Sequence, residues 1–239
     1  MARIDLTSIG IRLYYGEGTE NVKPASWADY IQLTGLKEIP EMNPAPDTID
    51  ATTFDEEEYK VYVEGLKDVG GSLGFTFNMT QEFIDNWDAL LDAIDELEGD
   101  LMWFLIDIPE LNKVFCFRGK PVPIGLSGVS VNALLEITAY ITPVNEPRWE
   151  SAPPNLTFSE APNVSLNGNV ISWDSILNAN KYKVYRSATS GGARTLVGIT
   201  TGLEYNLSFL GSGTHYITVD AEGRHYNPKK SAEKTLVIS

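Results

Sequence analysis

Cysteine and histidine are nearly missing from this sequence of 239 residues. Its one cysteine, Cys116, excludes an intrachain disulfide and lies in the apolar run 114–117, where a small buried residue is expected. The two histidines, His215 and His225, have no Cys, Asp or Glu at metal-ligand spacing. Zinc catalysis and histidine general-base chemistry are therefore poorly supported, and synthesis in a reducing cytoplasm is expected.

Long hydrophobic runs are missing too. The longest, residues 101–106, has the length of a strand, whereas a membrane-spanning helix needs roughly 20 apolar residues. The first five residues hold no apolar stretch of the kind that a secretory signal contains. We expect no membrane insertion and no secretion.

Motifs for catalysis are also lacking. Residues 125–128, Gly-Leu-Ser-Gly, fall short of a nucleophile elbow, and the glycine-rich residues 70–74 have no lysine for a phosphate cradle. The acid run 55–58 lacks the spacing of a calcium loop, so solvated carboxylates are the expected interpretation. The sequence predicts no cofactor, no metal site and no catalytic residue, and we expect a protein that is not an enzyme.

Basic residues are scarce in one half of the chain only. Residues 1–150 hold 10 Lys and Arg against 27 Asp and Glu, a net charge of −17, whereas residues 151–239 hold 8 against 6, a net charge of +2. The break predicts two modules with separate surfaces. An acidic surface repels phosphate, so the first half is a poor candidate for gripping nucleic acid.

Period-2 patterns predict strands in the first half. Residues 59–64 and 72–79 both alternate apolar with polar side chains around a glycine-rich connection, which predicts a β-hairpin between them. Further strands are expected over 101–108, 114–118 and 134–142.

One amphipathic helix is expected between these strands. Apolar residues recur at helical spacing from Phe83 to Leu97, with acids on the opposite face. Thr80 is the expected N-cap and Gly99 the expected C-cap. Covering a sheet is the common use of a single helix of this kind. Residues 35–58 show no periodicity and predict a long arm that contacts another surface.

The second half resembles a fibronectin type III domain over residues 155–239. The resemblance is carried by Val-Ile-Ser-Trp-Asp at 170–174, Tyr-Lys-Val-Tyr-Arg at 182–186, the segment 204–221 with its spaced Tyr, Leu, Gly-Thr, Tyr, Val and Ala, and a last strand over 235–239. Short alternating strands with frequent turn signals predict a β-sandwich independently of the family. Prolines between 143 and 162 predict a linker at the charge break.

The first half resembles the major tail tube proteins of long, non-contractile phage tails. The segments that carry the resemblance are 36–44, 47–53, 62–70, 73–77, the helix with Trp87, and 135–143, in this order and spacing. Tail tube proteins with an appended immunoglobulin-like or fibronectin-like domain share the whole layout. The expected fold class is all-β. Residues 1–145 are expected to form a sandwich or barrel flanked by one helix, residues 146–160 a Pro-rich linker, and residues 161–239 a fibronectin III-like sandwich.

This resemblance implies a virion structural protein, synthesised and assembled in the host cytoplasm, whose rings of six subunits stack into a hollow tube. Its partners would be other copies of itself and the tape measure, tail tip and tail terminator proteins. Phage DNA would pass through the lumen without binding, and the acidic first half suggests a lumen that repels DNA. The C-terminal domain would decorate the tube and touch cell-surface polymers weakly, or only stabilise the tube.

Two sets of residues are candidates for these roles. The polar members of the alternating strands are expected to face the lumen: Lys60, Tyr62, Glu64, Thr76, Asn78, Glu136, Thr138 and Tyr140. The long arm is expected to supply the contact between rings: Pro40, Glu41, Pro44, Asp47, Asp50, Asp55, Glu56, Glu57 and Glu58.

Two other classes of protein remain open. One is a carbohydrate-binding β-sandwich joined to a fibronectin-like domain, in which Trp27, Trp87, Trp103 and Trp149 would offer stacking faces. Trp87 and Trp103 lie in apolar patterns, which favours core packing for both. The other class is the inner tube of a contractile injection device, which shares the fold and the assembly logic.

Overall fold

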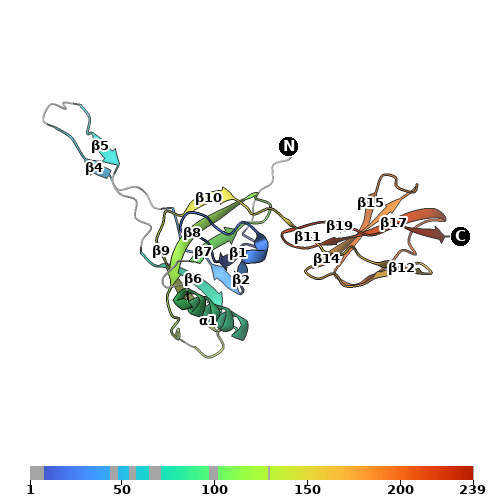
Figure 1. Ribbon diagram of the computed structural model, residues 1–239, viewed down its shortest axis with the longest axis horizontal. Coiled ribbons are helices and arrows are strands. Elements are labelled where there is room, and N and C mark those ends of the chain that lie inside the picture. The colour runs from blue at the N-terminus through green and yellow to red at the C-terminus, as the bar shows by residue number, and fades with distance from the viewer. Residues whose placement is uncertain are drawn as a thin grey trace. The chain divides into compact units, whose positions relative to one another are not determined.

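The computed structural model describes residues 8–43, 48–53, 58–64, 71–96, 102–128 and 130–238. The chain divides into two compact units at Pro153 and Pro154, each with its own core (Figure 1). Strands dominate both units, and α1 (Gln81–Glu96) is the one α-helix among the described residues. The expected all-β fold class with a single helix is confirmed.

An eight-stranded sheet forms the first unit. Its order is β2-β1-β7-β8-β9-β6-β3, and β10 pairs with β8 beside this path. The strands are β1 (Arg12–Gly16), β2 (Ile31–Leu33), β3 (Leu36–Glu38), β6 (Leu73–Asn78), β7 (Met102–Asp107), β8 (Lys113–Pro121), β9 (Glu136–Pro143) and β10 (Arg148–Ser151).

The sheet curls until it is nearly a barrel. Its two end strands, β2 and β3, are consecutive in the chain and joined only by Thr34 and Gly35, so the sheet has to bend to bring its ends together. Gly35 has a φ of 80°, which favours glycine, and its carbonyl accepts a hydrogen bond from the Asn78 N–H (2.8 Å). A Cβ at this position would lie 3.0 Å from the Asn78 carbonyl oxygen.

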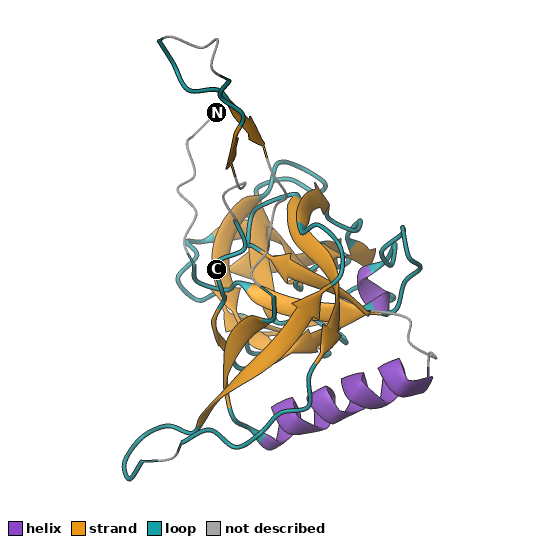
Figure 2. Ribbon diagram, turned by 90° about the vertical axis from the view of Figure 1, so that its left-hand side faces the viewer, coloured by secondary structure: helices purple, strands orange, loops and turns teal. Residues whose placement is uncertain are grey.

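The inner face of this sheet packs on α1 (Figures 1 and 2). Phe75 and Phe77 of β6 alternate with half-buried residues and lie in the same core as Phe83 and Trp87 of the helix. The Phe77 ring contacts both of these helix side chains. The helix begins as expected, because the Phe83 N–H donates to Thr80 Oγ1 (3.1 Å). The expected N-cap is confirmed, and Gly99 lies outside the described residues.

The opposite face of β1, β7 and β8 is also covered, which explains why β7 is buried at every position. The covering residues come from the segment around the 3₁₀-helix η1 (Trp27–Asp29) and from the chain after β10. The Trp27 indole N–H donates to the Pro153 carbonyl (2.8 Å), and its ring contacts Tyr14 and Tyr30. Cys116 is fully buried on this side, which confirms its expected structural role.

Burial of this second layer predicts a loss of stability in alkali. Burial, and then the charge of Glu150, raise the pKa of Cys116 to about 11. Burial also raises the pKa of Tyr30 in this layer and of Tyr15 in the core beside α1. The folded state therefore keeps protons that the unfolded chain releases above pH ~9, and stability falls as pH rises from about 9 through 11. We expect Cys116 to contribute about 1–3 kcal/mol of this loss in urea unfolding.

The matched control is Cys116→Ala. This variant is expected to be less stable at pH 7, because it leaves a cavity, but to lose less on passing from pH 8 to pH 11. An alkaline loss as large as that of the wild type would contradict the assignment to Cys116.

The predicted hairpin between residues 59–64 and 72–79 is wrong. Strand β5 (Tyr62–Glu64) pairs instead with β4 (Thr48–Asp50) in a separate two-stranded sheet, while β6 lies between β9 and β3. The physical reason is the core: Phe75 and Phe77 of β6 lie opposite Ala139 and Ile137 of β9 in the register that buries all four. Local alternation predicts a strand but does not say which strand it pairs with.

The second unit contains two sheets around one core. Leu166, Ile171 and Trp173 come from one sheet, and Tyr182, Val184 and Val219 from the other. The smaller sheet has the order β12 (Val164–Asn167), β13 (Val170–Trp173), β16 (Glu204–Asn206), and the larger has the order β15 (Thr195–Thr200), β14 (Lys181–Ser187), β17 (Gly213–Glu222), β19 (Lys229–Lys230), with β20 (Lys234–Ile238) also on β17. A two-stranded pair joins β11 (Leu156–Thr157) to β18 (Tyr226–Asn227).

Much of the segment expected to be a linker, 146–160, is ordered by hydrogen bonds. Its first part forms β10 on β8, and the Ala152 N–H donates to the Asn112 carbonyl (3.0 Å). Its last part forms β11, where the Leu156 N–H donates to the His225 carbonyl (2.7 Å). Residues before the division therefore form backbone hydrogen bonds with the first unit, and residues after it form backbone hydrogen bonds with the second unit.

Candidate assembly surfaces

Five of the eight candidate lumen residues share one face of the curled sheet. The register pairs Thr76 with Thr138 and Asn78 with Glu136, and Tyr140 lies opposite Gly74. Residues directly opposite each other in antiparallel strands project to the same side, and the alternate residues of both strands are buried in the core. The polar face of β3, β6 and β9 is therefore a continuous surface.

Charges of both signs lie on this polar face. Lys37 forms an ion pair with Glu136, and the Thr76 hydroxyl donates to Glu38 (3.5 Å). The excess of carboxylates lies elsewhere: α1 exposes six acidic side chains and carries no Lys or Arg. The described residues therefore give the polar face no large negative charge, and an acidic lumen stays a prediction.

The other three candidate lumen residues, Lys60, Tyr62 and Glu64, lie on or beside β5, apart from the polar face. Together with β4 they belong to a two-stranded ribbon, residues 48–53 and 58–64. All side chains described in this ribbon are exposed. An isolated two-stranded ribbon is at best marginally stable in water, so its apolar side chains require another surface.

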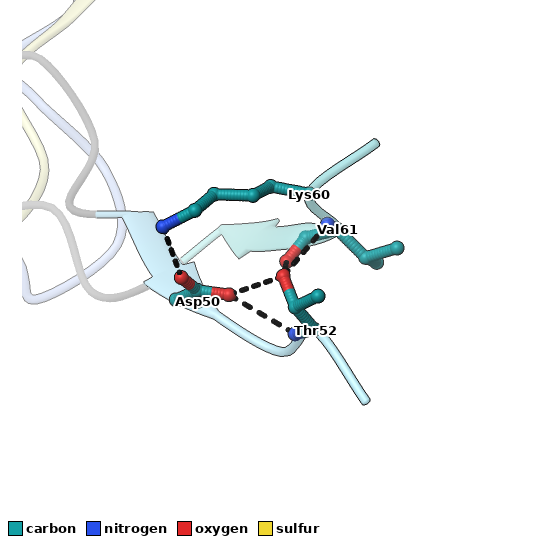
Figure 3. A network of polar contacts seen from close by, with 4 residues as sticks. All are labelled: Asp50, Thr52, Lys60 and Val61. Carbon is teal, nitrogen blue, oxygen red and sulfur yellow. Dashed lines mark hydrogen bonds and ion pairs between the residues drawn. The ribbon is translucent and has the colours of Figure 1, made fainter. Parts of the chain in front are cut away.

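A network of polar contacts holds the ribbon in register (Figure 3). Asp50 accepts hydrogen bonds from the Thr52 N–H (3.0 Å) and from the Thr52 hydroxyl, and pairs with Lys60 (3.1 Å). The Val61 N–H donates to Thr52 Oγ1 (3.1 Å), and the Ala51 N–H donates to the Val61 carbonyl (2.8 Å). The hydrogen bonds from the Thr52 hydroxyl and N–H, and then Lys60, lower the pKa of Asp50.

The two faces of the ribbon differ in chemistry. Ile49 lies directly opposite Val63, and Val61 is two residues before Val63, so these three side chains form an aliphatic face. Asp50 lies opposite Tyr62 on the other, polar face. Ile49 is 59% exposed and Val63 is 53% exposed, although both are side chains that proteins usually bury.

The candidate inter-ring residues are spread along the predicted arm, residues 35–58. Pro40 and Glu41 follow β3, Asp50 ends β4, and Glu58 precedes β5 with its side chain exposed. The remaining candidates lie outside the described residues: Pro44, Asp47, Asp55, Glu56 and Glu57.

Sequence reasoning did not single out the loop between β8 and β9, residues 122–135. This loop contains no Asp, Glu, Lys, Arg or His, in a chain of net charge −15. Leu126 is 77% exposed, Val131 is 92% exposed and Leu134 is 76% exposed. The absence of charge over such a length could have identified the loop as a surface that is not suited to face water.

The tryptophan side chains offer little for stacking on sugars. Trp87 and Trp103 are fully buried, as expected, and Trp27 is 6% exposed. Trp149 is 49% exposed and packs edge-on against Phe115. Three of the four faces that a carbohydrate-binding protein would use are thus occupied by the core.

Within the described residues, no helix has the length and apolar character that a membrane span requires. A scan against protein-family models and a search of curated proteins both find no match for this chain.

Proposed function

We propose that this protein is a self-assembling structural subunit of a phage-type tail tube, and that it is not an enzyme. The proposal rests on the sequence resemblance of the first half to tail tube proteins. One observation of the structure supports it most: an ordered ribbon whose aliphatic face is exposed on the single chain. An isolated two-stranded ribbon is marginally stable in water, and an exposed apolar patch marks a surface that binds a partner.

The polar face of β3, β6 and β9 fits the lumen of such a tube. One side of these strands packs on the core, and the other presents hydroxyls and paired charges to water. DNA slides along a surface that has no cluster of Lys or Arg to hold its phosphates. In this proposal the polar face lines the passage, and the ribbon makes the contact between rings.

The second unit has a different role in this proposal. Its core is complete without the first unit, and its net charge is close to zero. We assign it to the outside of the tube, where it decorates the surface and makes weak contacts with cell-surface polymers. Tape measure, tail tip and tail terminator proteins are the other partners that the proposal requires.

Electron microscopy of the wild-type protein tests this function. Rings of six subunits, stacked into hollow tubes, are expected when the protein is concentrated or when particles are recovered from its source. The central channel is expected to be lined by the polar face. Particles that contain this protein without annular assemblies would refute the proposal, and strong retention on insoluble polysaccharide would favour a carbohydrate-binding protein instead.

A further inference from the structure

The uncharged loop 122–135 is held at its base and exposed at its tip. The Trp87 indole N–H donates to the Val122 carbonyl (3.2 Å), and the Met79 N–H donates to the Leu135 carbonyl (2.8 Å). Ile124 packs against the core of the first unit. Between these anchored ends Leu126, Val131 and Leu134 are at least three-quarters exposed, so the loop presents aliphatic side chains to the surroundings.

Charge limits what can cover this loop. Most of the chain's 33 acidic residues lie in the first half, and α1 exposes six of them without any Lys or Arg. Two copies of such a protein repel each other wherever acidic surfaces approach. The loop has no charge. On the ribbon Asp50 and Lys60 neutralise each other, while Glu58 and Glu64 leave it a net charge of −2, so only its aliphatic face is free of charge.

We infer that the loop 122–135 of one copy is the docking surface for the aliphatic face of the ribbon of a second copy. This inference rests on the proposed function and names the partner surface that the ribbon requires. Aliphatic side chains match on the two sides: Ile49, Val61 and Val63 on the ribbon, and Leu126, Val131 and Leu134 on the loop. Burying them removes apolar area from water without desolvating a charge.

The geometry of assembly follows from the two surfaces being different. A contact between unlike patches is heterologous, so a pair of copies still has one free ribbon and one free loop for further neighbours. Contacts of this type form closed rings or open-ended stacks rather than a closed pair. The inferred contact therefore suits a polymer of unlimited length, as a tube requires.

Cross-linking between two variants that each carry one introduced cysteine tests the contact. Copies with Val63→Cys are assembled together with copies with Val131→Cys and then oxidised. Since the natural Cys116 is fully buried, the introduced thiols are the reactive ones. We expect a disulfide-linked dimer to be the main product. In the matched control, copies with Val63→Cys are mixed with copies with Val237→Cys instead, because Val237 is an exposed valine of the second unit. This mixture is expected to yield at least about tenfold less dimer.

A charged variant gives an independent measurement. Val131→Asp is expected to raise the concentration needed for assembly at least about tenfold and to leave the circular dichroism spectrum unchanged, because the side chain is 92% exposed. Normal tube formation by Val131→Asp, or a Val63–Val131 cross-link no stronger than the control, would overturn the inference and leave the proposed function intact. A wild type that forms no annular assembly would overturn both.

Discussion

Replacing Trp87 with alanine is expected to destabilise the first unit by about 3–5 kcal/mol. The Trp87 side chain is fully buried, and its ring contacts Phe77 of the sheet and Phe83 of the helix. Its removal leaves a cavity where α1 joins the sheet, and the indole N–H that holds the Val122 carbonyl is lost as well. Urea unfolding followed by circular dichroism measures the change.

Two further variants separate the causes. Trp87→Phe retains most of the buried ring but removes the hydrogen bond to Val122, so a smaller total loss is expected, of which about 1 kcal/mol comes from the unpaired carbonyl. Trp149→Ala removes a tryptophan that is 49% exposed, and it is expected to cost less than half as much as Trp87→Ala. Equal losses for Trp87→Ala and Trp149→Ala would contradict the assignment of Trp87 to the core.

Removing residues 44–70, which include the ribbon and the later part of the predicted arm, is expected to abolish assembly without unfolding the protein. In this variant a Gly/Ser linker replaces residues 44–70, which leaves β3, β6 and the core contacts of Ile39 and Met42 in place. The ribbon pairs with no strand of the large sheet, so the urea midpoint of the first unit is expected to change little. Loop closure depends only weakly on loop length, which also favours a small change.

The readout is assembly, measured by sedimentation and electron microscopy. The deletion variant is expected to stay monomeric at concentrations at which the wild type forms tubes. A matched variant keeps the arm at full length and replaces Ile49, Val61 and Val63 with serine; it is expected to fail in the same way. If the serine variant assembles normally, the aliphatic face is not the contact, and another part of the arm is responsible.

The helix and the alternating strands show how far local sequence patterns reach. The periodicity from Phe83 onward and the N-cap at Thr80 require only neighbouring residues, and both are present in the structure. The polar and apolar sides of β6 and β9 follow from alternation, since successive side chains point to opposite faces. Thr76, Thr138 and Tyr140 could therefore be assigned to a common polar side before the pairing of the strands was known.

Local patterns did not predict which strands pair with each other. Residues 59–64 alternate as well as residues 72–79 do, yet only β6 enters the large sheet, because its phenylalanines fill the core beside Ile137 and Ala139. Short strands such as β4, with three residues, carry too little pattern to be recognised. The exposure of Val131 could not be foreseen either, because an aliphatic residue in a sequence is more often buried.

The two units, the uneven distribution of charge, the helix with its N-cap and the faces of the longest strands can all be predicted from the amino-acid sequence. Each of these depends on composition or on contacts within a few residues. Three features are visible only in the folded chain: the sheet curls so that its end strands β2 and β3 are joined by two residues, β5 pairs with β4, and the ribbon and the loop 122–135 expose aliphatic side chains to water. These features depend on which distant segments fill the core, and burial in the core is a property of the whole chain.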